Sequence, residues 1–290
     1  MTSPNRDRLD SERRVLVGLI GAAIQASRSP ALHEREAAEQ GLTCLYQLID
    51  LERLGLGPDA LDDLLTAAQR MGFRGVNVTH PCKQAVIAHL DALSDEARAL
   101  GAVNTVLFED RRRIGHNTDS HGFAESFRRF MPDAPRDRVV QLGAGGAGAA
   151  VAAAALALGV GVLALADPDA AKLQTLVGQL NRRFGAGRAR VVDDLAAAVR
   201  AADGLINATP VGMANHPGLP LPQTLLRRNL WVADIVYFPL ETELLRTART
   251  LGARTLAGGG MAVFQAAEAF RLFAGRPADA DRMLRHFESM

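Results

Sequence analysis

The sequence predicts an α/β protein with two domains, the second of them built around a parallel sheet. Short apolar runs alternate with helical patterns along most of the 290 residues, and this alternation places helices on both faces of a parallel sheet. A glycine-rich turn joins one apolar run to a helix near the middle of the chain. Pro132 and Pro135 precede that turn in a polar stretch that is typical of a crossing between domains.

In the first part of the chain, apolar runs predict strands. Three segments that begin with proline predict helices, because proline is favoured in the first helical turn. The expected elements, in order, are a strand at 14–20, a helix at 30–40, a strand at 43–49, a helix at 58–71, a strand at 75–78, a helix at 81–90, and paired strands at 102–108 and around Ile114. We interpret the three arginines at 111–113 as the solvated tip of that hairpin.

The second part continues the alternation and ends in two helices. The expected elements are a helix at 119–130, a strand at 138–142, a helix at 149–158, strands at 163–167, 190–192, 204–207, 231–237 and 254–256, helices at 195–202 and 241–251, and closing helices at 261–274 and 278–287. The whole order fits a sheet that is covered on both faces.

The glycine-rich turn predicts a Rossmann-type, dinucleotide-binding unit. Residues 138–148 read RVVQLGAGGAG, an apolar strand that enters a glycine turn before a helix. Glycine lets a pyrophosphate approach the backbone N–H groups and the dipole at the helix start. Asp167 follows Gly143 by 24 residues, close to the spacing of the acid that accepts from the adenosine ribose hydroxyls. Since a carboxylate there repels a 2′-phosphate, we expect NAD rather than NADP.

Two stretches also allow membrane-related interpretations. Residues 142–166 carry no charged side chain, and an uncharged run of this length is typical of a transmembrane helix. Its glycines and alanines make it only weakly hydrophobic, which favours the soluble reading. Arg13 and Arg14 followed by the apolar stretch 15–24 resemble an export signal, but acids at Asp10 and Glu12 precede it.

The composition narrows the class of partner and compartment. With 33 basic and 32 acidic side chains, the formal charge of +1 gives no field that would attract nucleic acid or an anionic membrane. Two cysteines, Cys44 and Cys82, cannot form a disulfide framework and fit a reducing compartment. We therefore expect a cytoplasmic protein that acts on a small molecule.

Four polar clusters stand out in the first part of the chain, and each has a structural alternative. Ser27 and Ser29 can hold a carboxylate, or Ser29 can simply cap a helix. Asn77, Thr79 and Lys83 form the second cluster, Asn104 belongs to the third and Asp119 to the fourth. A lysine in the first turn of a helix opposes the helix dipole, which suggests a purpose for Lys83 beyond surface charge. An acid close to a lysine can relay a hydroxyl proton. Asn104 as a turn residue and Asp119 as a helix cap are the alternatives.

The order of the motifs resembles the shikimate dehydrogenase family. The motifs SxSP, NxTxPxK, GAVNTV, GxNTDxxG, GAGGAG, NATPxGM and GGGMxxxQAAEAF occur in this order from about Val17 to Phe273. The chain looks most like the NAD-dependent quinate/shikimate members, because Asp167 stands where NADP-using members have a basic turn. The segments HPCK at 80–83 and YFPLETELL at 237–245 also resemble those of the NAD-dependent members.

The resemblance implies a role for each matching residue. Lys83 exchanges the proton of the reacting C3 hydroxyl, and Asp119 anchors that oxygen and the lysine. Residues implied to bind shikimate or quinate are Ser27, Ser29, Asn77, Thr79, Asn104, Tyr237 and Gln265. Residues implied to line the NAD site are Gly143, Ala144, Gly145, Gly146, Ala147, Gly148, Asp167, Asn207, Ala208, Thr209, Pro210, Ile235, Gly258 and Met261.

The resemblance also implies domain limits. A substrate-binding catalytic domain is expected at 1–121, completed by the C-terminal helices at 261–290, with the dinucleotide-binding domain at 122–260. No metal is expected, although His116, Asp119 and His121 form one weak candidate group. A homodimer is possible.

Some alternatives stay open. The turn before Ser27 lacks a histidine that many members have, and Cys82 replaces a common aromatic residue. Position 29 is threonine in some quinate-using relatives, so the choice between quinate and shikimate is not decided. An NADP-dependent biosynthetic shikimate dehydrogenase and a ligand-sensing module without turnover are the two competing functions.

Overall fold

The computed structural model describes residues 13–290 and divides the chain into two compact units. Unit 1 contains the chain up to Thr118 together with Gln265–Met290, and unit 2 is Asp119–Phe264. The boundaries expected at residues 121 and 260 therefore fall at 118 and 264. The second boundary lies inside one helix, α12 (Gly258–Ala274), which no sequence signal interrupts. Residues 1–12, part of the expected first domain, lie outside the described residues.

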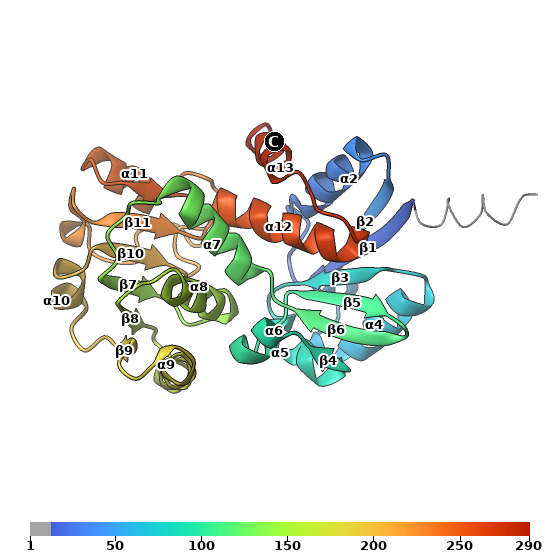
Figure 1. Ribbon diagram of the computed structural model, residues 1–290, viewed down its shortest axis with the longest axis horizontal. Helices are drawn as coiled ribbons and strands as arrows, with labels where there is room; N and C mark the ends of the chain where they lie inside the picture. The colour runs from blue at the N-terminus through green and yellow to red at the C-terminus, as the bar shows by residue number, and fades with distance from the viewer. Residues whose placement is uncertain (1–12) are drawn as a thin grey trace, which may run out of the picture. The chain divides into compact units, whose positions relative to one another are not determined.

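Unit 1 holds a mixed six-stranded sheet in the order β2-β1-β3-β5-β6-β4 (Figure 1). Its elements are β1 (Arg14–Gly21), α2 (Ser29–Glu39), β2 (Thr43–Asp50), α3 (Leu51–Leu54), η1 (Pro58–Ala60), α4 (Leu61–Arg70), β3 (Gly75–Val78), α5 (Cys82–Ala85), η2 (Val86–His89), β4 (Ala92–Leu93), α6 (Asp95–Leu100), β5 (Thr105–Glu109), β6 (Arg112–His116), the end of α12 and α13 (Ala280–Glu288). Strand β1 pairs in parallel with both β2 and β3, so the carboxyl ends of three strands meet at one edge.

Two apolar clusters hold that sheet from opposite sides. One joins β1 and β2 to α2 and α12, with Tyr46, Phe270 and Phe273 among its side chains. The other packs β1, β3 and β5 against α4, with Leu61 and Leu65 fully buried. Burying each such side chain stabilises the fold by about 1.5–3 kcal/mol before entropy is counted. The apolar stretch that resembled an export signal is thus β1, a buried interior strand of this sheet.

Unit 2 holds an all-parallel six-stranded sheet in the order β9-β8-β7-β10-β11-β12. Its elements are α7 (Asp119–Phe130), β7 (Arg138–Leu142), α8 (Gly146–Ala157), β8 (Val162–Ala166), α9 (Ala170–Phe184), β9 (Ala189–Val191), α10 (Leu195–Arg200), β10 (Gly204–Asn207), η3 (Gln223–Leu225), β11 (Trp231–Asp234), α11 (Glu243–Thr250), β12 (Thr255–Leu256) and the start of α12. This is the strand order of the Rossmann fold, with its switch point between β7 and β10. The predicted fold class is confirmed.

Helices cover both faces of this second sheet. Leucines of α11 pack with β7, β10 and β11 residues on one side, where α10 also lies, and Figure 1 shows α8 and α9 on the side opposite α10. The uncharged tract at 142–166 forms the end of β7, the short helix α8 and β8, so it is a buried βαβ unit. Among residues 13–290, no helix is long and apolar enough to cross a membrane.

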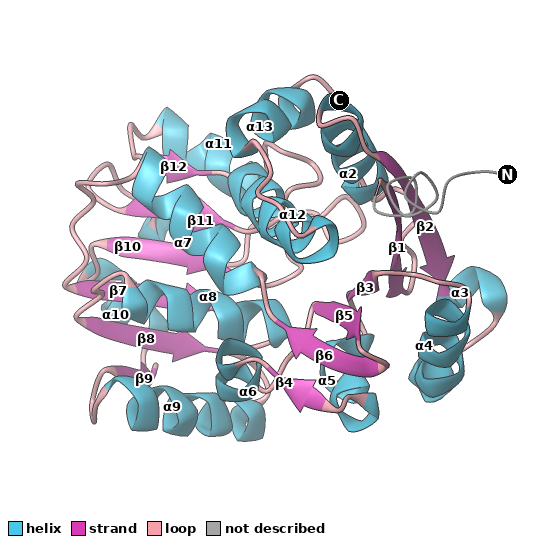
Figure 2. Ribbon diagram, turned by 45° about the vertical axis from the view of Figure 1, so that its right-hand side comes forward, coloured by secondary structure: helices cyan, strands magenta, loops and turns pink. Residues whose placement is uncertain are grey.

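Several expected elements differ in extent. The helix expected at 81–90 is one α-turn, α5, followed by the 3₁₀ turn η2, and the strand expected at 231–237 ends at Asp234. Helices α6 and α9 were not predicted, although Ser94 and Asp169 cap them through their side chains, a readable start signal. Figure 2 shows the helices and strands by type.

The interpretation of the arginine run as a solvated tip is wrong for Arg113. Its guanidinium donates to Asp62 at 2.6 Å and to Thr66 at 2.6 Å, both on α4, and its side chain is only 14% exposed. The turn itself falls at Asp110 and Arg111, both with positive φ. Because strand alternation points residue 113 toward α4, the third arginine ties the hairpin to the helix instead of facing water.

Candidate functional site

The first predicted cluster lies at residues 21–29, which run from the end of β1 to the first residue of α2; we call this segment the substrate loop after its predicted role. Helix α2 begins at Ser29, and its cap residue is Arg28, which makes no side-chain cap bond. Ser29 is therefore not the helix cap. Its N–H donates to the hydroxyl of Ser27 at 3.3 Å, and the N–H of Ser27 donates to Ile24 O at 3.0 Å. The loop thus presents two serine hydroxyls beside a helix start.

The substrate loop runs along the turn that follows β3. Ala22 N–H donates to His80 O at 3.0 Å, and Thr79 N–H donates to Ile20 O at 2.9 Å. A Cβ on Gly21 would lie 2.3 Å from Thr79 Cγ2, so only glycine allows this close approach. The structure therefore brings the serine cluster and the Thr79 cluster to one edge of the sheet.

A buried polar network joins three of the predicted substrate residues. Asn77 Nδ2 donates to Thr105 Oγ1 at 2.9 Å, and Thr105 Oγ1 donates to Asn104 Oδ1 at 3.0 Å. Asn104 Nδ2 donates to Thr118 Oγ1 at 2.9 Å, which in turn donates to Gln265 Oε1 at 3.3 Å. Asn104 is thus a network residue and not a turn former. Amides fixed in this way suit the binding of several hydroxyl groups in defined positions.

Sequence reasoning missed three members of this network. Tyr46 Oη donates to Asn77 Oδ1 at 2.8 Å and fixes which way that amide faces. Thr105 and Thr118 bridge the predicted amides. Thr105 and Thr118 stand inside motifs that the sequence showed, but Tyr46 lies on β2 and carries no local signal. Only the pairing of β2 with β1 brings it here.

Lys83 lies on the single turn α5, half-buried, and its carbonyl accepts from Val103 N–H at 2.8 Å. That bond ties the lysine backbone to the strand region that carries Asn104. The argument from an opposed helix dipole does not apply, because a four-residue turn has no separate first turn. The case for Lys83 therefore depends on its neighbours and not on the helix.

Asp119 is the first residue of α7 and is buried. It belongs to unit 2, while Thr118 beside it belongs to unit 1. Within residues 13–290 no group of three or more His, Cys, Asp or Glu side chains is arranged to hold a metal ion, so His116, Asp119 and His121 do not form such a group.

The predicted cofactor residues of unit 2 gather at the carboxyl ends of β7, β8, β10 and β11. The turn at residues 143–148, which we call the glycine loop, joins β7 to α8. Gly143 has φ +96°, and a Cβ there would lie 2.5 Å from Ala208 O. A Cβ on Gly148 would lie 2.5 Å from Gly143 O, whereas one on Gly145 would meet no atom within 4 Å. Gly143 and Gly148 thus close the loop, and Gly145 leaves open space before the start of α8, where anions bind.

Gln141, which sequence reasoning missed, lies in β7 and supports the glycine loop from within the sheet. Its side chain is completely buried in β7. Its Nε2 donates to Gly143 O at 2.9 Å and to Gly148 O at 2.8 Å. An amide in the middle of a buried strand costs desolvation energy, and these two bonds offset part of that cost. The signal for it was a polar residue inside an otherwise apolar strand.

Asp167 follows β8 and lies against the glycine loop. Its Oδ2 accepts from Ala144 N–H at 2.6 Å, and its Oδ1 accepts from Asp169 N–H at 2.9 Å. Asp169 in turn caps α9 by accepting from Lys172 N–H at 3.0 Å. Two carboxylates therefore stand together at the end of β8, beside the predicted phosphate loop.

Asn207 organises the loop that follows β10. Its Oδ1 accepts from Thr209 N–H at 3.1 Å and from Thr209 Oγ1 at 2.7 Å. Its Nδ2 donates to Asp234 Oδ1 at 3.0 Å, and Thr242 Oγ1 donates to Asp234 Oδ2 at 2.7 Å. Burial raises the pKa of the Asp234 carboxyl above its usual range, although these donors oppose the shift. Sequence reasoning missed Asp234 and Thr242, which anchor the loops that carry the predicted cofactor residues.

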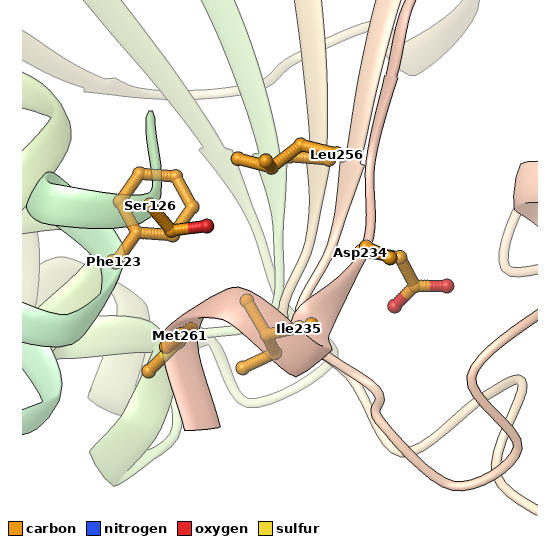
Figure 3. Close-up of a pocket in the computed structure, with 9 residues that line it drawn as sticks. Phe123, Ser126, Asp234, Ile235, Leu256 and Met261 are labelled. Atoms are coloured by element: carbon orange, nitrogen blue, oxygen red, sulfur yellow. The ribbon is translucent and has the colours of Figure 1, made fainter. Parts of the chain in front are cut away.

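Three more predicted residues lie around the start of α12. A Cβ on Gly258 would lie 2.5 Å from Ile235 O, which brings these two predicted residues together. Met261, Ile235 and Asp234 line a narrow pocket with Phe123, Ser126 and Leu256 (Figure 3). Pro210 follows Thr209 in the Asn207 loop. Tyr237 lies beyond β11 and is 42% exposed, so it is available to a ligand.

Comparison with known proteins identifies the family. The family described as "Shikimate dehydrogenase substrate binding domain" matches residues 19–106. A shikimate dehydrogenase (NADP(+)) from Streptomyces avermitilis is 61% identical over 271 residues, which cover 93% of each chain. A quinate/shikimate dehydrogenase (NAD(+)) from Corynebacterium efficiens is 47% identical over 95% of this chain and 98% of that one.

Solved structures agree with the sequence comparison. Quinate dehydrogenase from Corynebacterium glutamicum in complex with NAD superimposes with a TM-score of 0.89 and 44% identity, covering 96% of this chain and 99% of that one. Shikimate 5-dehydrogenase from Thermus thermophilus in complex with NADP(H) and shikimate gives a TM-score of 0.83 at 34% identity, covering 95% and 99%. The predicted resemblance is confirmed, and this chain belongs to the shikimate dehydrogenase family of oxidoreductases.

Proposed function

We propose that the chain is an NAD-dependent quinate/shikimate dehydrogenase that interconverts the C3 hydroxyl and ketone of a cyclic polyhydroxy acid. The observation that carries this proposal is the network of Asn77, Asn104 and Gln265. Fixed amides and threonine hydroxyls on one unit suit a ring that bears several hydroxyls. The glycine loop on the other unit suits a dinucleotide.

Ser27 and Ser29 are the proposed hydrogen-bond donors to the substrate carboxylate. Both hydroxyls stand beside the N-terminus of an eleven-residue helix, α2, whose dipole favours an anion. Tyr237 completes the proposed contacts at the carboxylate end. The ring hydroxyls are proposed to bind Thr79, on the turn that contacts the substrate loop, and the three network amides.

Lys83 is the proposed general acid and base. When bound, the nicotinamide accepts or donates the hydride. Lys83 takes the proton of the C3 hydroxyl as the alcohol is oxidised and returns it when the ketone is reduced. Asp119, buried and acidic, accepts a hydrogen bond from the hydroxyl or from the ammonium group and so holds the proton-transfer partners in place.

NAD is proposed over NADP because of Asp167 and Asp169. The relatives carry both names, since the Streptomyces enzyme is named for NADP(+) and the Corynebacterium enzyme for NAD(+). In this chain the end of β8 carries two carboxylates beside the glycine loop. A 2′-phosphate next to them would meet like charge, whereas ribose hydroxyls can donate to Asp167.

Replacing Lys83 by alanine tests the mechanism. Loss of a general acid or base lowers turnover by about 100- to 10,000-fold, while the Kd of shikimate measured by titration should change little. A kcat within threefold of the parent value would remove Lys83 from the reaction.

Assays of shikimate and quinate with both cofactors test the rest of the proposal. We expect kcat/KM to favour NAD, and Asp167→Asn to shrink that preference. A parent protein that prefers NADP would contradict the NAD assignment and support a biosynthetic enzyme. No turnover of either acid with either cofactor would support the ligand-sensing alternative.

Homodimerisation and a cytoplasmic location stay predictions. Light scattering of the purified protein and fractionation of the source cells would test them. Neither affects the assignment of residues above.

A further inference from the structure

The substrate loop contains a residue in a backbone conformation that its side chain disfavours. Ala23 has φ +54°, in the left-handed region, where a Cβ is penalised and glycine is the usual choice. A non-glycine residue keeps this conformation only where surrounding contacts hold it. The loop therefore depends on support from outside its own sequence.

Asp50, the last residue of β2, provides that support. Its Oδ1 accepts from Ala23 N–H at 3.0 Å, and its Oδ2 accepts from Ile24 N–H at 3.2 Å and from Gln25 Nε2 at 2.9 Å. Oδ1 also accepts from Glu52 N–H at 3.2 Å. Arg53 Nη1 donates to Gln25 Oε1 at 2.9 Å, which fixes the Gln25 amide with its N–H₂ toward Asp50. The buried carboxylate thus meets four donors.

The contacts continue from Asp50 to the serines. Asp50 holds Ile24 by its N–H, and Ile24 O accepts from Ser27 N–H at 3.0 Å. Ser27 Oγ then accepts from Ser29 N–H at 3.3 Å. A shift of the loop at Ala23 or Ile24 would therefore move both hydroxyls that are assigned to the substrate carboxylate.

Asp50 itself is not placed to bind the substrate. Its side chain is buried, with 4% of the residue exposed, and its oxygens are occupied by the loop and by α3. Its contacts in the substrate loop are Ala23, Ile24 and Gln25, which precede Ser27 along the chain. An acid with this arrangement acts on recognition through the loop backbone.

We propose that Asp50 is a positioning residue for carboxylate recognition: it holds the substrate loop in the strained conformation that presents Ser27 and Ser29 to the acid group of the substrate. This inference rests on the proposed role of those two serines. It assigns to Asp50 the selectivity for an acid over its neutral ester, and no part in proton transfer or cofactor binding.

The test measures kcat/KM for shikimate and for its methyl ester in the parent protein and in Asp50→Asn. Asparagine turns an acceptor into a donor that faces backbone N–H groups, so KM for the acid should rise about tenfold. The kcat should stay within about twofold. The ratio of acid to ester kcat/KM should fall by a similar tenfold, and KM for NAD should not change.

A rescue variant and a matched control sharpen the result. Adding Ala23→Gly to Asp50→Asn should restore acid selectivity by about threefold or more, because glycine adopts the left-handed conformation without support. Asp91→Asn is the control, since Asp91 also accepts from a backbone N–H, that of Arg113 at 2.7 Å, but not in the substrate loop. It should leave the ratio unchanged.

Equal losses for acid and ester in Asp50→Asn, or no gain from Ala23→Gly, would overturn the inference and leave Asp50 as a general structural residue. Should Asp50→Asn not fold, Gln25→Leu removes one of the four donors and should lower the ratio about twofold to threefold; an unchanged ratio overturns the inference. Ser27→Ala and Ser29→Ala separate the two proposals. If the two serine variants leave the acid-to-ester ratio unchanged, the proposed role of the serines is wrong. If they lower the ratio while Asp50→Asn leaves it unchanged, the role of the serines stands and the inference about Asp50 is wrong.

Discussion

The substrate loop and the glycine loop are each held by a different buried side chain, and these two side chains have opposite hydrogen-bonding character. Asp50 accepts from backbone N–H groups of the substrate loop. Gln141 donates to backbone carbonyls of the glycine loop. The difference follows from what each loop must offer. A pyrophosphate is bound by backbone N–H groups, and Gln141 does not compete for them because it donates to carbonyls, although Ala144 N–H of the same loop donates to Asp167. A carboxylate held by serine hydroxyls leaves backbone N–H groups available to the support.

The two supports also differ in sequence distance. Gln141 lies two and seven residues from the carbonyls that it holds. Asp50 lies 27 and 26 residues from the N–H groups that it accepts from. Arg28 of the substrate loop donates to Phe287 O, 259 residues away, and stacks over the Phe287 ring at 4.9 Å. The support that Gln141 gives the glycine loop is thus local, although Asp167 also accepts from Ala144 N–H across 23 residues, while the substrate loop depends on contacts from the whole of unit 1.

The largest effect that the comparison of the two loops predicts separates the two roles of glycine in the glycine loop. Gly148→Ala places a Cβ 2.5 Å from Gly143 O, and such overpacking costs about 1–3 kcal/mol. We expect a 10- to 100-fold rise in the Kd of NAD, measured by NADH fluorescence, together with a lower Tm.

Gly145→Ala is the matched variant, because its Cβ meets no protein atom within 4 Å. Its Tm should equal that of the parent, while its Kd for NAD should still rise, since a methyl group there obstructs the pyrophosphate. A lower Tm for Gly145→Ala, or an unchanged Kd in both variants, would contradict this division of roles.

This contrast explains what the sequence could predict. The glycine loop was predictable because its glycines, strand and helix are contiguous, and the parallel sheet followed from the alternation of elements. Asp50 and Tyr46 were not predictable, since they act through the pairing of β2 with β1. Arg113 was misread for the same reason, because its partners lie on α4. Buried polar residues that act across strands leave no local pattern.

The second prediction tests the dependence of unit 1 on its C-terminal helix. Glu36 on α2 has a fully buried carboxylate that accepts from Arg282 of α13 at 2.7 and 2.9 Å. Arg282→Ala leaves that charge with Gln40 and Asp279 N–H as donors, so we expect a loss of about 2 kcal/mol in unfolding free energy. KM for shikimate should also rise, because α13 carries Phe287, whose carbonyl accepts from Arg28 of the substrate loop.

The readouts for Arg282→Ala are urea unfolding and KM for both substrates. Kd for NAD should stay at the parent value, since Gln141 and Asp167, which hold the glycine loop, belong to unit 2. A rise in that Kd comparable to the rise in KM for shikimate would show that the two loops are not supported independently. Arg271→Ala is the matched control, because Arg271 pairs with Glu268 on the surface of α12, and such exposed pairs contribute about 0–1 kcal/mol.

The third prediction removes the local support. Gln141→Leu keeps the volume in β7 and loses both bonds to the loop carbonyls, each of which contributes about 0.5–1.5 kcal/mol. We expect Kd for NAD to rise about tenfold, while Kd for adenosine, which has no pyrophosphate, stays constant. Equal weakening of both ligands would assign Gln141 to the sheet and not to the loop.

The smallest expected effect is a pH dependence of opposite sign in the two units. The hydrogen bond from Gln25, followed by backbone donors and opposed by desolvation, lowers the pKa of Asp50 below its ordinary 3.8. Its contribution to stability is therefore complete above pH about 4–5 and is lost as pH falls through the lowered value. Burial raises the pKa of Asp234. Its protonated form favours folding, and that contribution is lost as pH rises through the raised value.

The measurement is urea unfolding of the parent, Asp50→Asn and Asp234→Asn between pH 3 and 7. Since stability rises with pH wherever the unfolded chain binds more protons, removing Asp50 should flatten the rise of stability with pH near and below pH 4. Removing Asp234 should steepen the rise above that pH, because there the folded parent keeps a proton on Asp234 that the unfolded chain has already lost. Shifts of the same sign in both variants would mean that the two acids titrate alike, and the contrast between an acid that holds a loop by its charge and one whose pKa is raised by burial would fail.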